Sequence, residues 1–244
     1  PTIITGGRIV DGAPRMWDGS EEIKTEEEAR AIVRAHKSAG YDFIKVYSSL
    51  TPEIFDIIAD EAKAQNIPFS GHVPVSVTLE HAMRSGMATI EHLTGFKEAT
   101  YKEGVDFGKG FFSKERMDIG SKLNSGELSF DDIFDPSKTK TMADLATETG
   151  VWNVPTLIVI DKIFLTRKEA DVQFSRPEIK YIVPAIQSMW NPDNDFRRKN
   201  TTDEQLKAMQ GFFQREVDTV TILHEAGANI MSGTDAPNPY VFHG

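Results

Sequence analysis

One pattern recurs along the chain: a polar stretch with helical spacing ends at a glycine, and a short apolar run follows. In its first occurrence Thr25 can cap a helix over residues 25–39, with Glu28 three residues on and Gly40 at its end. Further predicted helices begin at Thr51-Pro52 or cover residues 78–85, 139–149 and 203–226. The predicted strands are residues 41–47, 67–73, 87–93, 154–160 and 229–235, with residues 1–5 as a sixth.

Strands that alternate with helices of this length predict a parallel sheet with right-handed crossover connections. The sequence contains neither the glycine-rich loop of dinucleotide-binding folds nor a P-loop. We therefore expect an α/β fold, a TIM-like (β/α)8 barrel rather than a nucleotide-binding open sheet. Six strands do not close that barrel, so we expect residues 1–244 to be an incomplete piece that covers roughly strands 3 to 8.

Two long segments interrupt the pattern. Residues 94–136 are polar with scattered aromatic side chains, and residues 161–202 carry mixed charges with Trp190 among them. Both follow strand ends, where the loops of a barrel carry its catalytic face. They are either surface insertions with local helices or a lid over a substrate, and the sequence leaves both interpretations open.

Side chains capable of chemistry stand near the ends of several predicted strands. Lys45 alternates with the apolar Ile44 and Val46, so it points to the opposite face, the inside of a barrel. His72 and His92 end the next two strands. One such histidine is typical of a core or rim residue, but two in successive strands beside an inward lysine favour a shared site. The alternative for Lys45 is a lysine that simply reaches solvent.

Asp235 ends the last predicted strand, after small residues and before a proline. A carboxylate there can ligate a metal and accept a proton from water, or it can cap the turn that follows. Neutral imidazole and carboxylate groups suit zinc and similar divalent ions. A free lysine does not, but Lys45 carbamylated by carbon dioxide would be a carboxylate on a long arm that could bridge two metals.

Other polar residues near these strand ends are weaker candidates. Tyr47 shares the face of Lys45, so its hydroxyl either aims at a substrate or packs at the rim. His243 follows the Asp235 loop and could touch a substrate. Glu91 precedes His92, and alternation predicts that it faces outward. The three remaining histidines fall in predicted helices.

The composition of the chain excludes some classes of binding partner and some kinds of site. The formal net charge is −10 and the isoelectric point is about 5.1, which argues against nucleic acid or anionic lipid as a partner. The absence of cysteine excludes disulfides, zinc–thiolate sites and cysteine nucleophiles. We expect no membrane association and a possible homo-oligomer; the location is open, with the cytoplasm as a guess.

The set of motifs resembles the metal-dependent amidohydrolase superfamily, and more narrowly its imidazolonepropionase/prolidase-like branch. The matching pieces span nearly the whole chain in the family's order: Ile44-Lys45-Val46-Tyr47, Gly71-His72-Val73-Pro74, Ile90-Glu91-His92-Leu93, Val154-Pro155-Thr156-Leu157 and Ser232-Gly233-Thr234-Asp235-Ala236-Pro237. The resemblance implies a distorted eight-stranded barrel beside a small β-sandwich made from the two chain ends.

The resemblance also implies roles for the site residues. Lys45 on strand 4 would be carboxylated and bridge two metals, and His72 on strand 5 and His92 on strand 6 would hold the more exposed one. Asp235 on strand 8 would bind the buried metal and carry the proton to the leaving nitrogen. Tyr47 matches a tyrosine that helps to bind the substrate's terminal group in related peptidases.

One element of the family's pattern is missing. No two histidines stand two positions apart, so the His-x-His pair of strand 1 would lie upstream of Pro1, with strands 1–2 and the sandwich. We expect zinc as the cofactor, with one or two ions, the second of which requires that pair. The resemblance implies a hydrolase that uses metal-activated hydroxide on an amide, urea-type or Xaa-Pro-like dipeptide C–N bond of a small molecule or dipeptide. The alternatives are a truncated, non-catalytic remnant or metal-binding scaffold, or a Schiff-base lyase with Lys45 as nucleophile.

Overall fold

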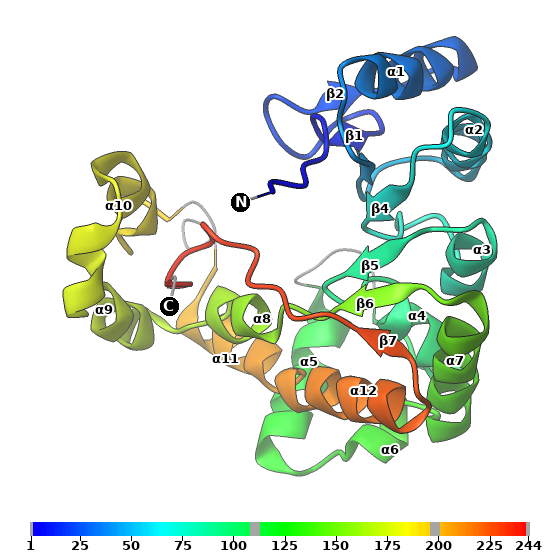
Figure 1. The fold of residues 1–244 in the computed structure, drawn as a ribbon. Coiled ribbons are helices and arrows are strands. Elements are labelled where there is room, and N and C mark those ends of the chain that lie inside the picture. The colour runs from blue at the N-terminus through cyan, green and yellow to red at the C-terminus, as the bar shows by residue number, and fades with distance from the viewer. Residues whose placement is uncertain (1, 108–112, 196–200, 243–244) are drawn as a thin grey trace. The chain divides into compact units, whose positions relative to one another are not determined.

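The computed structural model describes residues 2–107, 113–195 and 201–242 of the chain, shown in Figure 1. The chain divides into two compact units. The first comprises residues 1–101, 135–155 and 219–231, and the second comprises residues 102–134, 156–218 and 232–244. That residues 1–244 form one partial barrel domain stays a prediction.

The first unit contains a parallel sheet of seven short strands in the order β2-β1-β3-β4-β5-β6-β7. The predicted α/β class is therefore confirmed. Within the part of the chain that the structure describes, the sheet is open, with β2 and β7 as its edges. The strands are β1 Val10–Asp11, β2 Glu21–Glu22, β3 Ile44–Val46, β4 Phe69–Gly71, β5 Thr89–Glu91, β6 Trp152–Val154 and β7 Asn229–Ile230.

Helices cover one face of this sheet, as Figure 1 shows for α1, α2, α3 and α7. Ile44, Val46 and Ile90 point into the core between sheet and helices, and all three are fully buried. The polar residues that alternate with these three along β3 and β5 therefore lie on the opposite face of the sheet. The helices of this unit are α1 Glu26–Ser38, α2 Pro52–Ala64, α3 Leu79–Arg84, α4 Phe96–Thr100, α7 Pro136–Thr149 and the last part of α12 Phe213–Glu225.

The helix starts agree with their sequence signals. Thr25 and Glu28 form the reciprocal capping box that their spacing predicts. Thr51 and Thr78 cap α2 and α3 by accepting a backbone N–H three residues on. These caps fix where α1, α2 and α3 begin.

The second unit is helical, and the two segments that interrupt the sequence pattern supply most of it. The expectation of local helices there is confirmed; the lid remains a prediction. Leu165, Ala170, Trp190 and Tyr240 form one of its buried clusters. Its elements are α5 Lys114–Ser125, α6 Phe130–Ile133, α8 Leu157–Ile163, α9 Arg167–Phe174, the 3₁₀ turn η1 Pro177–Tyr181, α10 Pro184–Trp190, α11 Asp203–Gln210 and the first part of α12. Across the described residues, no helix combines the length and apolar character that crossing a membrane requires.

Two predicted strands are misplaced. The described residues of 1–5 are not a strand: Gly6 makes a single bridge to Phe43, and β1 follows at Val10–Asp11. Residues 154–160 contain only the end of β6, because Thr156 has a positive φ of 47° and turns the chain into α8. The apolar run that suggested a strand is the start of that helix.

Two further boundaries differ from expectation. The predicted helix 203–226 is two helices, since α11 ends at Gln210 and α12 begins at Phe213. Gly211 lies at the break, against the backbone oxygen of Gly120 in α5, where a larger residue would collide. The last strand is also shorter than predicted: β7 ends at Ile230, five positions before Asp235.

Candidate functional site

Lys45 and Glu91 lie on the same face of the sheet. The register pairs Lys45 with Ser70 and Ser70 with Thr89, so these three residues form a row across β3, β4 and β5. Glu91 is two positions beyond Thr89 and therefore points to the same side. The Lys45 ammonium contacts the Glu91 carboxylate, and both side chains are mostly enclosed, with 18% and 20% exposed.

The expectation that Glu91 faces outward is wrong. β5 ends at Glu91, and His92 and Leu93 both have positive φ, 55° and 52°. Alternation therefore does not continue past Glu91, and the left-handed turn brings His92 back to the side of Glu91. The His92 Nε2 lies 3.9 Å from the Glu91 Oε2. The sequence signal that could have found Glu91 is the apolar Ile90: if Ile90 faces the helices, as Ile44 and Val46 do, alternation puts Glu91 on the side of Lys45.

His72 directly follows β4 and is buried. It is preceded by Gly71, whose φ is +130° and whose Cβ position would collide with the carbonyl oxygen of Val46. Only glycine lets β4 end so close to β3, which sets the imidazole beside the loop after β3. The His72 ring stacks on Tyr47 with ring centres 4.0 Å apart and meets His92 edge-on at 4.9 Å.

The surroundings keep the His72 imidazole neutral. Burial, with smaller contributions from His92 and Lys45, lowers the pKa of His72 to about 2. The Ser48 hydroxyl lies 2.9 Å from His72 Nδ1. When Nδ1 carries the proton and donates a hydrogen bond to Ser48, the lone pair of Nε2 is left to bind a metal ion, as in metal-binding histidines.

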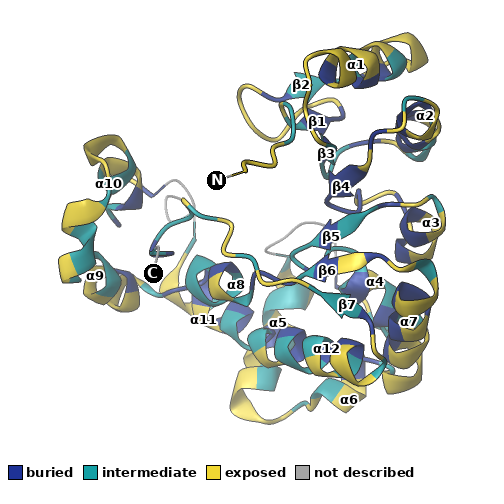
Figure 2. Cartoon of the chain, in the orientation of Figure 1, coloured by how far each residue is buried: buried dark blue, intermediate teal, exposed yellow. Residues whose placement is uncertain are grey.

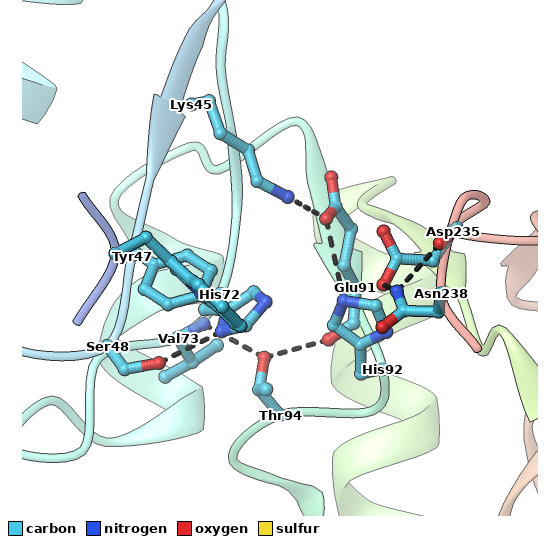
Figure 3. A network of polar contacts seen from close by, with 11 residues as sticks. Lys45, Tyr47, Ser48, His72, Val73, Glu91, His92, Thr94, Asp235 and Asn238 are labelled. Atoms are coloured by element: carbon cyan, nitrogen blue, oxygen red, sulfur yellow. Dashed lines mark hydrogen bonds and ion pairs between the residues drawn. The ribbon is translucent and has the colours of Figure 1, made fainter. Parts of the chain in front are cut away.

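A threonine links the two turns that carry the histidines (Figure 3). Thr94 Oγ1 accepts a hydrogen bond of 2.9 Å from the backbone N–H of Val73 and donates one of 3.0 Å to the Glu91 carbonyl. Because these bonds tie the end of β4 to the turn after β5, His72 and His92 keep a defined separation.

These side chains fit a divalent cation. The ligand atoms of His72, Glu91 and His92 all lie within 4.8 Å of one another. Small side-chain rotations can bring such atoms to the distances of about 2.0–2.2 Å that zinc requires from nitrogen and oxygen. Two imidazoles and a carboxylate also match the ligand types that zinc and similar ions select. The described part of the chain therefore holds a candidate metal centre at the carboxyl ends of β4 and β5.

The other predicted site residues are not members of this group of metal-ligating residues. Tyr47 packs on His72, and its hydroxyl accepts a 2.7 Å hydrogen bond from the Trp17 indole, a neighbour that sequence reasoning missed. Asp235 belongs to the second unit, where it has a φ of 49° and its carboxylate accepts a 2.7 Å bond from the Asn238 side chain. Its part in the site stays a prediction. His243 lies outside the described residues.

Comparison with solved structures shows the class of fold. Bottromycin amidohydrolase superposes with a TM-score of 0.58 at 22% identity, covering 97% of this chain and 47% of its own. A Xaa-Pro dipeptidase with bound methionine gives 0.51 at 16%, covering 98% and 49%, and A. niger ochratoxinase gives 0.51 at 17%, covering 94% and 45%. The chain thus spans about half the length of these proteins and has the fold of part of an amidohydrolase-type barrel.

The resemblance to the metal-dependent amidohydrolase superfamily, inferred from the sequence motifs, is therefore confirmed at the level of the fold. A scan against models of protein families finds no match, and a search of curated proteins finds none either.

Proposed function

We propose that the protein is a metal-dependent hydrolase that cleaves an amide, urea-type or Xaa-Pro-like dipeptide C–N bond. The observation that carries this proposal is the convergence of His72, Glu91 and His92 at one end of the sheet, with Lys45 beside them. The structural neighbours that are an amidohydrolase and a Xaa-Pro dipeptidase support the reaction class. Because the chain spans only about half of their length, we propose this activity for the whole protein that contains the chain.

In this proposal His72 and His92 hold a divalent ion, with zinc as the first candidate. A bound ion of this kind polarises a carbonyl oxygen and lowers the pKa of water. Ser48 orients the His72 ring through Nδ1, so that Nε2 faces the ion. A second ion would need the upstream His-x-His pair that the resemblance implies.

Lys45 is proposed to act as a carbamate, a carboxylate at the end of a long side chain. A carbamate keeps one N–H on Nζ, which can still donate to the Glu91 carboxylate that contacts Nζ here. Glu91 then holds the arm in place, and the same oxygen, Oε2, lies 3.9 Å from His92 Nε2, so the carboxylate can also serve as a ligand. The alternative use of Lys45, as a Schiff-base nucleophile, leaves His72 and His92 without a shared task.

Proton transfer is assigned to Asp235, which would take a proton from the attacking water and deliver it to the leaving nitrogen. Asp235→Asn should therefore lower kcat by at least about a hundredfold, the usual contribution of a general base, and leave the fold intact. Full activity of that variant would remove Asp235 from the proposal.

Metal analysis tests the function most simply. The protein that contains this chain should bind zinc near one equivalent, and a chelator should abolish its hydrolysis of N-acetyl amino acids and dipeptides. His72→Ala and His92→Ala should each lower the zinc content. His224→Ala is the matched control, since His224 is exposed on α12. Equal zinc in all variants would refute the ligand assignment, and zinc binding without turnover of any C–N substrate would favour a metal-binding scaffold.

A further inference from the structure

The loop between β1 and β2 presents two large apolar side chains to solvent. Met16 is 59% exposed and Trp17 is 44% exposed. In Figure 2 most of this loop is coloured as exposed. Adjacent apolar residues that are held out on a loop are typical of a binding surface.

Trp17 is connected to the candidate metal centre by two contacts. Its indole N–H donates a 2.7 Å hydrogen bond to the Tyr47 hydroxyl, and the Tyr47 ring stacks on His72 at 4.0 Å. The indole is therefore oriented by the same residue that covers the proposed metal ligand. Tyr47 thus links the partly exposed Trp17 side chain to the buried His72 ring within one compact unit.

A buried carboxylate holds this loop in place. Asp11 is fully buried, and its side chain accepts 2.7 Å and 3.0 Å hydrogen bonds from the backbone N–H groups of Ser49 and Met16. One carboxylate thus ties the loop that carries Trp17 to the loop after β3, which places Ser48 against His72. Gly12 is packed against the carbonyl oxygen of Ser49, where any Cβ would collide.

Charged residues flank Met16 and Trp17 on both sides, with Arg15 before them and Asp18 after them, and both are exposed. The Arg15 backbone N–H donates to Glu22 at 3.0 Å, and its guanidinium donates to the Ser20 carbonyl at 3.4 Å. The side chains of Met16, Trp17 and Tyr47 themselves offer apolar surface with one phenol hydroxyl, and these two charges border it. Aromatic side chains of this kind stack favourably with other flat aromatic rings.

We infer that Trp17 is a specificity-determining residue, and that Met16 and Trp17 bind an apolar, planar substituent next to the scissile C–N bond. Substrates would then be acyl amino acids or dipeptides with an aromatic side chain, in preference to small ones. This inference rests on the proposed hydrolase function, because the surface is identified by its continuity with the candidate metal centre.

Steady-state kinetics with a matched pair of substrates tests the inference in the full protein. N-acetyl-phenylalanine should have a higher kcat/KM than N-acetyl-alanine. Trp17→Ala should lower kcat/KM for the phenylalanine substrate about tenfold, through KM, which is the scale of an apolar contact in a specificity pocket. The alanine substrate should change less than about twofold. Trp17→Phe, which keeps a ring, should retain most of the preference.

Tyr41→Ala is the control, because Tyr41 is a partly exposed aromatic residue before the amino end of β3, away from the candidate centre. An equal loss for both substrates in Trp17→Ala, or no loss, would overturn the inference.

If neither substrate is hydrolysed, calorimetry of the zinc-loaded protein measures whether the surface binds them. A binding preference for N-acetyl-phenylalanine that Trp17→Ala removes would support the surface and contradict the hydrolase, and equal or absent binding would overturn the surface.

Discussion

Lys45 and Glu91 stand 46 positions apart in the sequence, yet the ammonium of one contacts the carboxylate of the other. The parallel register of β3, β4 and β5 produces this meeting, because it places both side chains on the face of the sheet opposite the helices. The pair stands beside His72 and His92, so a mostly enclosed lysine and carboxylate border the candidate metal centre.

Removal of the Glu91 carboxylate should weaken metal binding. Glu91→Ala loses both a possible ligand and the group that holds Lys45, so we expect a zinc dissociation constant about 10- to 100-fold higher, the usual effect of losing a group that supports the ligands. Competition with a fluorescent zinc chelator measures this constant. Glu98→Ala, at an exposed position of α4, is the control and should bind zinc like the original protein. Unchanged affinity in Glu91→Ala would place Glu91 outside the centre.

The helix starts and most of the sheet could be predicted because their causes are local. Thr25 with Glu28, and Thr51 before Pro52, are capping signals within four residues, and they form as expected. The alternation of Ile44, Lys45 and Val46 likewise determines which side chain leaves the core.

Glu91 was assigned to the wrong face because its orientation depends on where β5 ends. The positive φ of His92 is a conformation that an extended-strand pattern does not predict. Trp17 was missed for a different reason: its contact with Tyr47 joins two loops 30 positions apart, and no periodic pattern encodes such a contact.

The buried Asp11 holds both the loop that carries Trp17 and the loop that places Ser48 against His72, so its replacement should affect substrate binding. In Asp11→Asn the side-chain amide replaces one acceptor oxygen, so the N–H of Met16 or of Ser49 faces a donor. We expect KM for N-acetyl-phenylalanine to rise about tenfold, the scale of one specificity contact, with a much smaller change in kcat. Asp18→Asn, on the same loop and exposed, is the control. A variant that is less thermostable but has unchanged KM would show that Asp11 only supports the fold.

Acid should weaken the contact between α1 and α2. Glu61 accepts hydrogen bonds from Arg34, Gln65 and Arg30, and these, with Arg34 first, lower the pKa of Glu61 to about 2 from 4.5. A carboxyl whose pKa is lower in the folded state stabilises the fold fully above its unfolded pKa. That contribution is lost as the pH falls from 4.5 towards 2.

Urea unfolding of the protein and of Glu61→Gln across this pH range measures the effect. The free energy of unfolding should differ most at neutral pH, and the difference should shrink as the pH falls through this window. Glu53→Gln, on the exposed start of α2, should follow the original protein more closely. A pH-independent difference for Glu61→Gln would contradict the assignment of the lowered pKa.

The proposed carbamate on Lys45 has a direct spectroscopic test. Protein equilibrated with ¹³C-bicarbonate should show a carbamate carbon resonance that is missing in Lys45→Ala. Lys45→Ala should also lose activity and regain part of it with propionate, which supplies a carboxylate in the vacated space. Lys63→Ala, on the far end of α2, should behave like the original protein. A protein that is active without any carbamate resonance would show that Lys45 works unmodified beside Glu91.

His72 and His92 are proposed to hold a divalent ion at the carboxyl ends of β4 and β5. Anomalous diffraction at the zinc edge, from crystals of the zinc-loaded full protein, tests it most directly. We expect a strong peak about 2.0–2.2 Å from a ring nitrogen of each of these two histidines. A peak bound elsewhere in the molecule, with both imidazoles lacking an ion at that distance, would contradict it.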